Sequence, residues 1–250
     1  MFVEWPIETS RADHCALEPR VWTVFDLVVG LAILALGFVS LIAIQVLLVG
    51  LGASTNPNAI DVPRALLSLA FEALLAVVAW LLAARRGLSL HALGLRLPRR
   101  WGFLPVALVG AYVALVAYHL LLQLIARLGV DTSGLMEGNT LPVGDGVSLA
   151  TWIVLGIAVV VVAPVAEELF FRGLIFRALV ARVPLPVAYA VSGLVFGGFH
   201  LNVAVLVPFA LIGAIFAWAF WNSGSLWTTI GAHAAVNGLS FAFAVAGAVP

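Results

Sequence analysis

The sequence has no lysine, a single cysteine and few charges of either sign. Only 10% of its 250 residues are charged, with 12 basic residues, all of them arginine, balanced by 12 acidic ones. A formal net charge of zero gives no strongly basic surface of the kind that binds nucleic acid. A lone Cys15 can form neither an internal disulfide nor a cysteine-rich metal site.

Apolar residues fill the chain instead, at 64% of the sequence. A soluble domain is nearer 45–50% apolar and about 25% charged. A soluble core of this size cannot hide such an excess, so the composition predicts an integral membrane protein. Because helices satisfy their own backbone hydrogen bonds in lipid, we expect an all-α fold, a polytopic transmembrane helix bundle.

Turn signals and polar loops divide the chain into about seven spans, or eight pieces if one of them is broken. The expected segments are Val21–Leu51, Arg64–Ala84, Phe103–Leu128, Leu149–Val183, a segment ending near His200, Val203–Trp221 and Leu226–Ala248. The stretch that begins at Leu149 is too long for one upright span. Pro164 is the expected site of a bend or break, and the sequence leaves open one kinked helix or two pieces.

Arginines are densest in the loop that contains Arg85, Arg86, Arg96, Arg99 and Arg100. Positively charged loops stay on the cytoplasmic side, so this loop and the N-terminus are expected there. We also predict that the protein is an integral protein of a prokaryotic cytoplasmic membrane. Its expected parts are a cytoplasmic tail (1–20), N-terminal transmembrane helices and loops (21–148) and a C-terminal transmembrane core (149–250).

The segment around Pro164 carries Glu167, Glu168 and Arg172 inside an otherwise apolar run. Ionisable groups in the hydrocarbon region are costly, and they mark functional sites by default. Glu168 and Arg172 are four residues apart, with acid before base, which predicts an intrahelical ion pair. Glu72, in the second segment, is interpreted as a carboxyl group that hydrogen-bonds a neighbouring helix, with a catalytic role as the alternative.

Glu167 and His200 lie at matching distances from the expected hairpin at Val183–Pro184, since each is 16 positions from the nearer hairpin residue. In antiparallel helices the two side chains would lie at one depth and could act as an acid/base pair that activates water. Gly197 and its neighbour Gly198 are expected to let the helices approach closely, which would bring the imidazole within reach.

His233 and Asn237 are four residues apart on the last segment and so share one helical face. Both side chains can donate hydrogen bonds to an oxyanion at a scissile carbonyl. Zinc ligation by Glu167, His200 and His233 is the alternative. The spacing His-Glu-x-x-His is absent, and three separate helices would have to assemble such a site.

Glu167-Glu168-x-x-x-Arg172, Phe196-x-x-x-His200 and His233-x-x-x-Asn237, taken in this order, resemble the three motifs of the CAAX protease and bacteriocin-processing (CPBP, or Abi) family. That family includes the type II CAAX prenyl endopeptidases. The resemblance implies a glutamate intramembrane protease in which Glu167 and His200 activate water and His233 and Asn237 stabilise the oxyanion. It implies no cofactor, although the family has often been labelled a metalloprotease.

The favoured hypothesis is therefore an intramembrane endopeptidase whose peptide or protein substrate enters from the cytoplasmic side or from the membrane. The alternative is a non-catalytic scaffold or bacteriocin-immunity partner with the same fold. A proton-coupled transporter ranks last because the sequence shows no inverted repeat.

Overall fold

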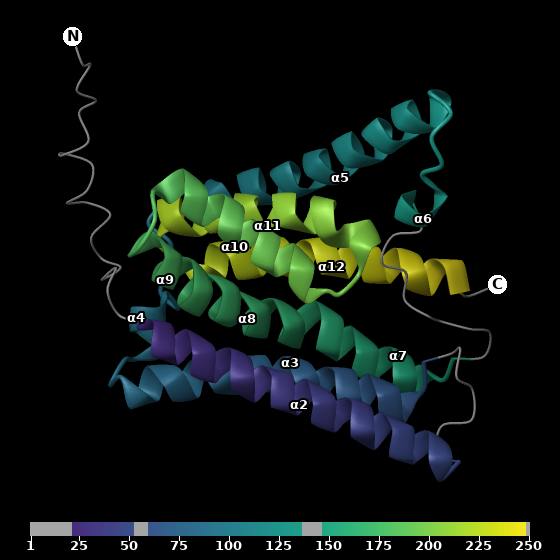
Figure 1. The fold of residues 1–250 in the computed structure, drawn as a ribbon, viewed down its shortest axis with the longest axis horizontal. Coiled ribbons are helices and arrows are strands. Elements are labelled where there is room, and N and C mark those ends of the chain that lie inside the picture. Colours follow the sequence, from purple (N-terminus) through teal and green to yellow (C-terminus); the bar gives the residue numbers. More distant parts are fainter. Residues whose placement is uncertain (1–21, 53–59, 137–146, 249–250) are drawn as a thin grey trace.

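A computed structural model describes residues 22–52, 60–136 and 147–248. Every regular element in these ranges is helical, which confirms the predicted all-α bundle (Figure 1). The expected tail 1–20, with Cys15, lies outside the described residues.

Six helical stretches of the described chain are long and apolar enough to cross a membrane, and the shorter α10 (Leu185–Phe199) makes a seventh apolar helix. The six are α2 (Val24–Gly50), α3 (Val62–Arg85), α5 (Phe103–Arg127), the composite stretch Leu149–Val180, α11 (Val203–Ser223) and α12 (Leu226–Ala248). Short helices α4 (Leu90–Leu93) and α6 (Ser133–Met136) flank α5 in the chain. The protein is thus an integral membrane protein.

Pro164 does not break the long fourth stretch. The stretch runs continuously through α7 (Leu149–Gly156), the π-helical η1 (Ile157–Val162), α8 (Ala163–Glu168), the π-helical η2 (Leu169–Phe176) and α9 (Arg177–Val180). At the junction before Pro164, the amide of Ala163 donates to the carbonyl of Ala158, five residues back. Proline cannot donate an amide hydrogen bond, and the wide π-helical turn before it lets the helix continue without one.

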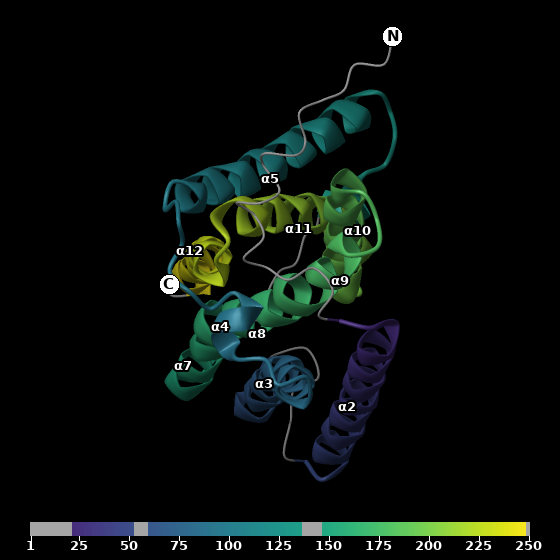
Figure 2. The same cartoon turned by 90° about the vertical axis from the view of Figure 1, so that its left-hand side faces the viewer.

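This composite helix lies at the centre of the bundle. The ribbon places it between the pair α2 and α3 on one side and the group α10, α11 and α12 on the other (Figures 1 and 2). All eight residues of η2 are buried, including Arg172. Two charged groups of one segment, Glu168 and Arg172, are therefore completely enclosed by protein rather than lipid.

Small residues allow α10 to pack very closely against α11. A Cβ atom at Gly193 or Gly197 would overlap a backbone carbonyl oxygen of α11. Gly198 differs, because a Cβ atom there would meet nothing closer than Leu206 Cδ1, at 4.0 Å. The prediction for this pair was therefore wrong for Gly198. Gly197 does allow a close approach, but the helix it contacts is α11 and not the composite helix that carries Glu167.

Candidate active site

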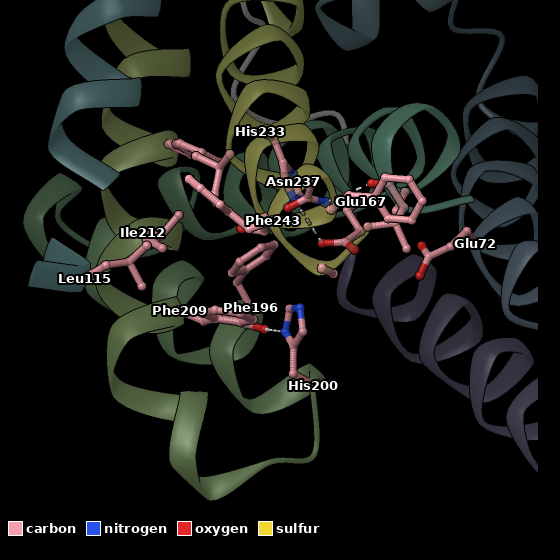
Figure 3. A pocket seen from close by; sticks show the side chains of 17 residues that line it. Glu72, Leu115, Glu167, Phe196, His200, Phe209, Ile212, His233, Asn237 and Phe243 are labelled. Atoms are coloured by element: carbon pink, nitrogen blue, oxygen red, sulfur yellow. Dashed lines mark hydrogen bonds and ion pairs between the residues drawn. The ribbon is translucent and has the colours of Figure 1, made fainter. Parts of the chain in front are cut away.

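A cavity of about 710 Å³ lies among α3, α5, the composite helix, α10, α11 and α12 (Figure 3). Most of its wall is apolar, with Phe, Leu, Ile, Val and Ala side chains. Its polar lining residues are Glu72, Glu167, His200, His233, Asn237 and Ser240. The structure thus brings the four residues predicted to be catalytic to one space, from α8, from the end of α10 and from α12.

Glu167 is 6% exposed and points into this cavity (Figure 3). Its Oε2 atom is buried and takes part in no hydrogen bond. His233 Nε2 lies 3.9 Å from that oxygen, which is longer than a hydrogen bond. Glu167 is therefore a buried carboxyl group that lines the cavity and whose Oε2 has no hydrogen-bond partner.

Glu168 and Arg172 form the predicted intrahelical ion pair, with 2.8 Å between Oε1 and Nη1 and both side chains fully buried. The guanidinium also donates from Nη2 to the carbonyl of Gly213, at 3.0 Å. It lies 4.6 Å from the ring centroid of Phe196 and 5.4 Å from that of Phe216. Arg172 therefore contacts Glu168 and the two aromatic rings, and it does not line the cavity.

His233 connects this ion pair to the cavity. Its Nδ1 lies 3.2 Å from Glu168 Oε1, so an Nδ1–H can donate to the ionised carboxylate. That bond turns Nε2 toward Glu167 and the cavity. Glu168 therefore orients the imidazole, a contact across 65 positions of sequence that the motif spacing alone did not indicate.

His200 caps the C-terminal end of α10. Its Nδ1 lies 2.9 Å from the carbonyl oxygen of Phe196, and because a carbonyl only accepts, Nδ1 must carry the hydrogen. Neutral His200 then has a lone pair on Nε2. The ring of Phe209 packs edge-to-face against the imidazole, with 4.5 Å between centroids. No hydrogen bond joins His200 to Glu167, although both line the same cavity.

α10, which ends beside His200, is shorter than a full membrane span. Its 15 residues rise about 22 Å at about 1.5 Å per residue, less than the roughly 30 Å of a hydrocarbon core. The turn after His200 contains Leu201, which has a φ of 50°, a backbone conformation that non-glycine residues rarely adopt. If α10 begins at the membrane surface, His200 at its other end therefore lies within the hydrocarbon region.

Asn237 lines the cavity one turn after His233. Its Nδ2 donates to the carbonyl of Val159, at 2.9 Å, within the π-helical η1. One amide hydrogen is therefore used to fix the side chain, and the second remains for a ligand.

Glu72 also lines the cavity, from α3, and Figure 3 shows it on the same side as Glu167. Its buried Oε2 has no hydrogen-bond partner, so the hydrogen bond to a neighbouring helix that the sequence suggested is not made by this oxygen. Only the packing of α3 against α8 and η1 reveals its place in the site. The one signal in the sequence was a carboxyl group inside an apolar segment.

The donor atoms do not form a zinc site in this arrangement. Among the residues that the structure describes, no three His, Cys, Asp or Glu side chains are placed to share a metal ion. A zinc site normally needs at least three protein ligands. A mechanism without a cofactor stays a prediction.

Comparison with known proteins places the three motifs in a recognised family segment. Residues 149–239 match the family described as "Type II CAAX prenyl endopeptidase Rce1-like". The chain is also 31% identical over 77 residues to "Putative membrane peptidase YdiL" of Bacillus subtilis (strain 168). That similarity covers 31% of this chain and 32% of the relative, about a third of each. No solved structure matches the chain. The predicted family resemblance is thus confirmed for residues 149–239.

Proposed function

We propose that this protein is an intramembrane endopeptidase that hydrolyses a peptide bond with a water molecule activated by Glu167 and His200. The observation that carries the proposal is the shared cavity, which Glu167, His200, His233 and Asn237 all line although they come from separate segments. All four also fall within the residues that match the peptidase family.

Water activation fits the free atoms of the first pair. Glu167 Oε2 is unbonded, and His200 has its Nδ1 engaged, which leaves Nε2 for the cavity. A water held by the Glu167 carboxylate and by His200 Nε2 would lose a proton to Glu167 as its oxygen bonds to the scissile carbonyl carbon. The same proton then passes to the leaving nitrogen as the C–N bond breaks, so that one carboxyl group and one amine are released.

Oxyanion stabilisation is the role proposed for the second pair. Glu168 orients His233, and the carbonyl of Val159 orients Asn237, so both side chains are held before the substrate arrives. Because Nδ1–H of His233 is donated to Glu168, the form proposed to donate from Nε2 to the oxyanion is the doubly protonated imidazolium. Donors that are already fixed need no reorganisation when negative charge develops on the carbonyl oxygen. Glu168 and Arg172 would act by positioning His233 and by compensating each other's charge.

Glu167→Ala tests the proposal in a peptide-cleavage screen with purified, detergent-solubilised protein. We expect cleavage to fall by about 10²–10⁴-fold, the usual contribution of a general base. Ser240→Ala is the matched control, because Ser240 lines the same cavity and has no proposed role. Cleavage by Glu167→Ala at the wild-type rate would refute the catalytic assignment. Binding of a partner protein without any cleavage would favour the scaffold alternative.

A further inference from the structure

Glu72 is a cavity carboxyl group to which the proposed hydrolysis gives no task. It comes from α3, outside the segment 149–239 that matches the peptidase family. The Oε2 atom of Glu72 is buried and has no hydrogen-bond partner. The same is true of Oε2 of Glu167, a residue that is 6% exposed. Both residues line the same cavity. Two acidic groups thus face one cavity, each with an oxygen that lacks a partner.

No arginine or lysine lines the cavity, all of whose lining residues the structure describes. The nearest buried guanidinium, that of Arg172, is bonded to Glu168 and to the carbonyl of Gly213. His200 and His233 have one ring nitrogen each engaged by other groups. Among the described residues, no basic side chain forms an ion pair with Glu72.

A buried carboxylate without a partner is costly, and such groups are normally paired or neutralised. A basic side chain would satisfy the carboxylate, and its aliphatic stem would contact the apolar wall of the cavity. The volume of about 710 Å³ lies in the range of roughly 300–1,000 Å³ that is usual for ligand sites. A basic residue beside an apolar stretch is also typical of the cytoplasmic flank of a membrane helix.

We propose that Glu72 determines specificity by binding a lysine or arginine side chain of the peptide substrate close to the scissile bond. This inference rests on the proposed peptidase function. It gives the substrate class as an apolar peptide with a basic residue near the cleaved bond. Because Glu72 lies outside the family segment, the preference belongs to this chain and not to the shared catalytic motifs.

The test measures binding separately from cleavage. Two synthetic apolar peptides are compared, identical except for one lysine in the first and the neutral, similarly shaped norleucine in the second. The position of this residue is moved along the peptide. Dissociation constants are measured by fluorescence anisotropy on the full chain carrying His200→Ala, which keeps both carboxyl groups and should not turn the peptide over.

At one position we expect the lysine peptide to bind roughly tenfold tighter, or more, than the norleucine peptide, as expected for hydrogen bonds to a charged group. Adding Glu72→Gln should remove this preference and leave norleucine binding unchanged, which also shows that the variant is folded. Adding Ser240→Ala, the matched control, should keep the preference. In the otherwise wild-type chain, Glu72→Gln should lower kcat/KM for the lysine peptide alone, by the same factor.

Three outcomes would overturn the inference: equal binding of both peptides at every position, a lysine preference that survives Glu72→Gln, or no binding of either peptide. The proposed function fails differently. Lysine-selective binding that depends on Glu72, without cleavage by the wild-type chain, would remove the peptidase proposal and keep the cation site. Cleavage with no lysine preference would keep the peptidase proposal and remove the cation site.

Discussion

At the scale of single residues, the buried ion pair of Glu168 and Arg172 fixes the carboxylate that contacts His233. Both side chains are completely enclosed, and each makes a further contact, Glu168 with His233 and Arg172 with Gly213. A buried pair of this kind adds little net stability, but the loss of one partner leaves an uncompensated charge. The pair therefore serves to position His233 beside Glu167.

Arg172→Met should destabilise the protein by about 3–5 kcal/mol, because it leaves the Glu168 carboxylate buried and unpaired. Thermal unfolding in detergent measures the effect. The double variant Glu168→Gln/Arg172→Met removes both charges and should regain much of the lost stability, although not the orientation of His233. An unfolding temperature of Arg172→Met equal to that of the wild type would contradict the structural role of the pair.

Metal removal also tests the site at this scale. The described residues contain no group of three metal-binding side chains, so chelation should leave peptide cleavage intact. The measurement is cleavage before and after exhaustive treatment with EDTA, with the metal content of the same preparation determined in parallel. Stoichiometric zinc lost together with activity would overturn the prediction.

At the scale of elements, the two π-helical stretches and the α10–α11 hairpin shape the site. The composite helix stays continuous through Pro164 because η1 precedes it, and η1 also offers the Val159 carbonyl to Asn237. The hairpin fixes the end of α10 that carries His200 through the contact of Gly193 and Gly197 with α11. The backbone of one element thus orients a side chain of another.

Gly197→Ala and Gly198→Ala form a matched pair for this contact. A Cβ atom at position 197 would overlap the backbone carbonyl of Leu206, whereas the same atom at 198 meets nothing closer than 4.0 Å. We expect Gly197→Ala to lower thermal stability by more than 1 kcal/mol and to reduce cleavage, because α10 must move and His200 moves with it. Gly198→Ala should be neutral or slightly stabilising, since alanine favours a helix. Equal effects of the two variants would contradict the assigned glycine face.

At the scale of the whole molecule, arginines join several loops at one end of the bundle. Arg86, after α3, pairs with Asp26 at the start of α2, at 2.6 Å. Arg182, after α9, donates to the carbonyl of Trp22, also at 2.6 Å. Arg96 donates to a carbonyl in the turn between α11 and α12. These contacts place the arginine-bearing loops on one side, where the positive-inside rule predicts the cytoplasm.

Reporter fusions test this orientation. A fusion in the loop near Arg96 should give the signal of a cytoplasmic reporter, and one in the polar segment between α5 and α7 should give a periplasmic signal. The opposite pattern would reverse the predicted topology. It would also move substrate entry away from the cytoplasmic side.

The sequence by itself determined the membrane setting, the helical class and the pairs that lie four residues apart. Glu168 with Arg172, and His233 with Asn237, share a helix face by local geometry, so their spacing was sufficient. The family motifs indicated which side chains belong together, although not the contacts that hold them.

Only the tertiary structure decided the contacts between helices. His233 meets Glu168, Asn237 meets Val159, and Glu72 faces the same cavity as Glu167. Each of these depends on how helices distant in sequence rotate and pack, and the periodicity of a single helix carries no information about its neighbour's rotation. The sequence also left open whether the helix breaks at Pro164, because this too depends on packing against other helices. A proline removes one hydrogen bond, and whether the helix breaks or widens into a π-turn depends on the packing around it.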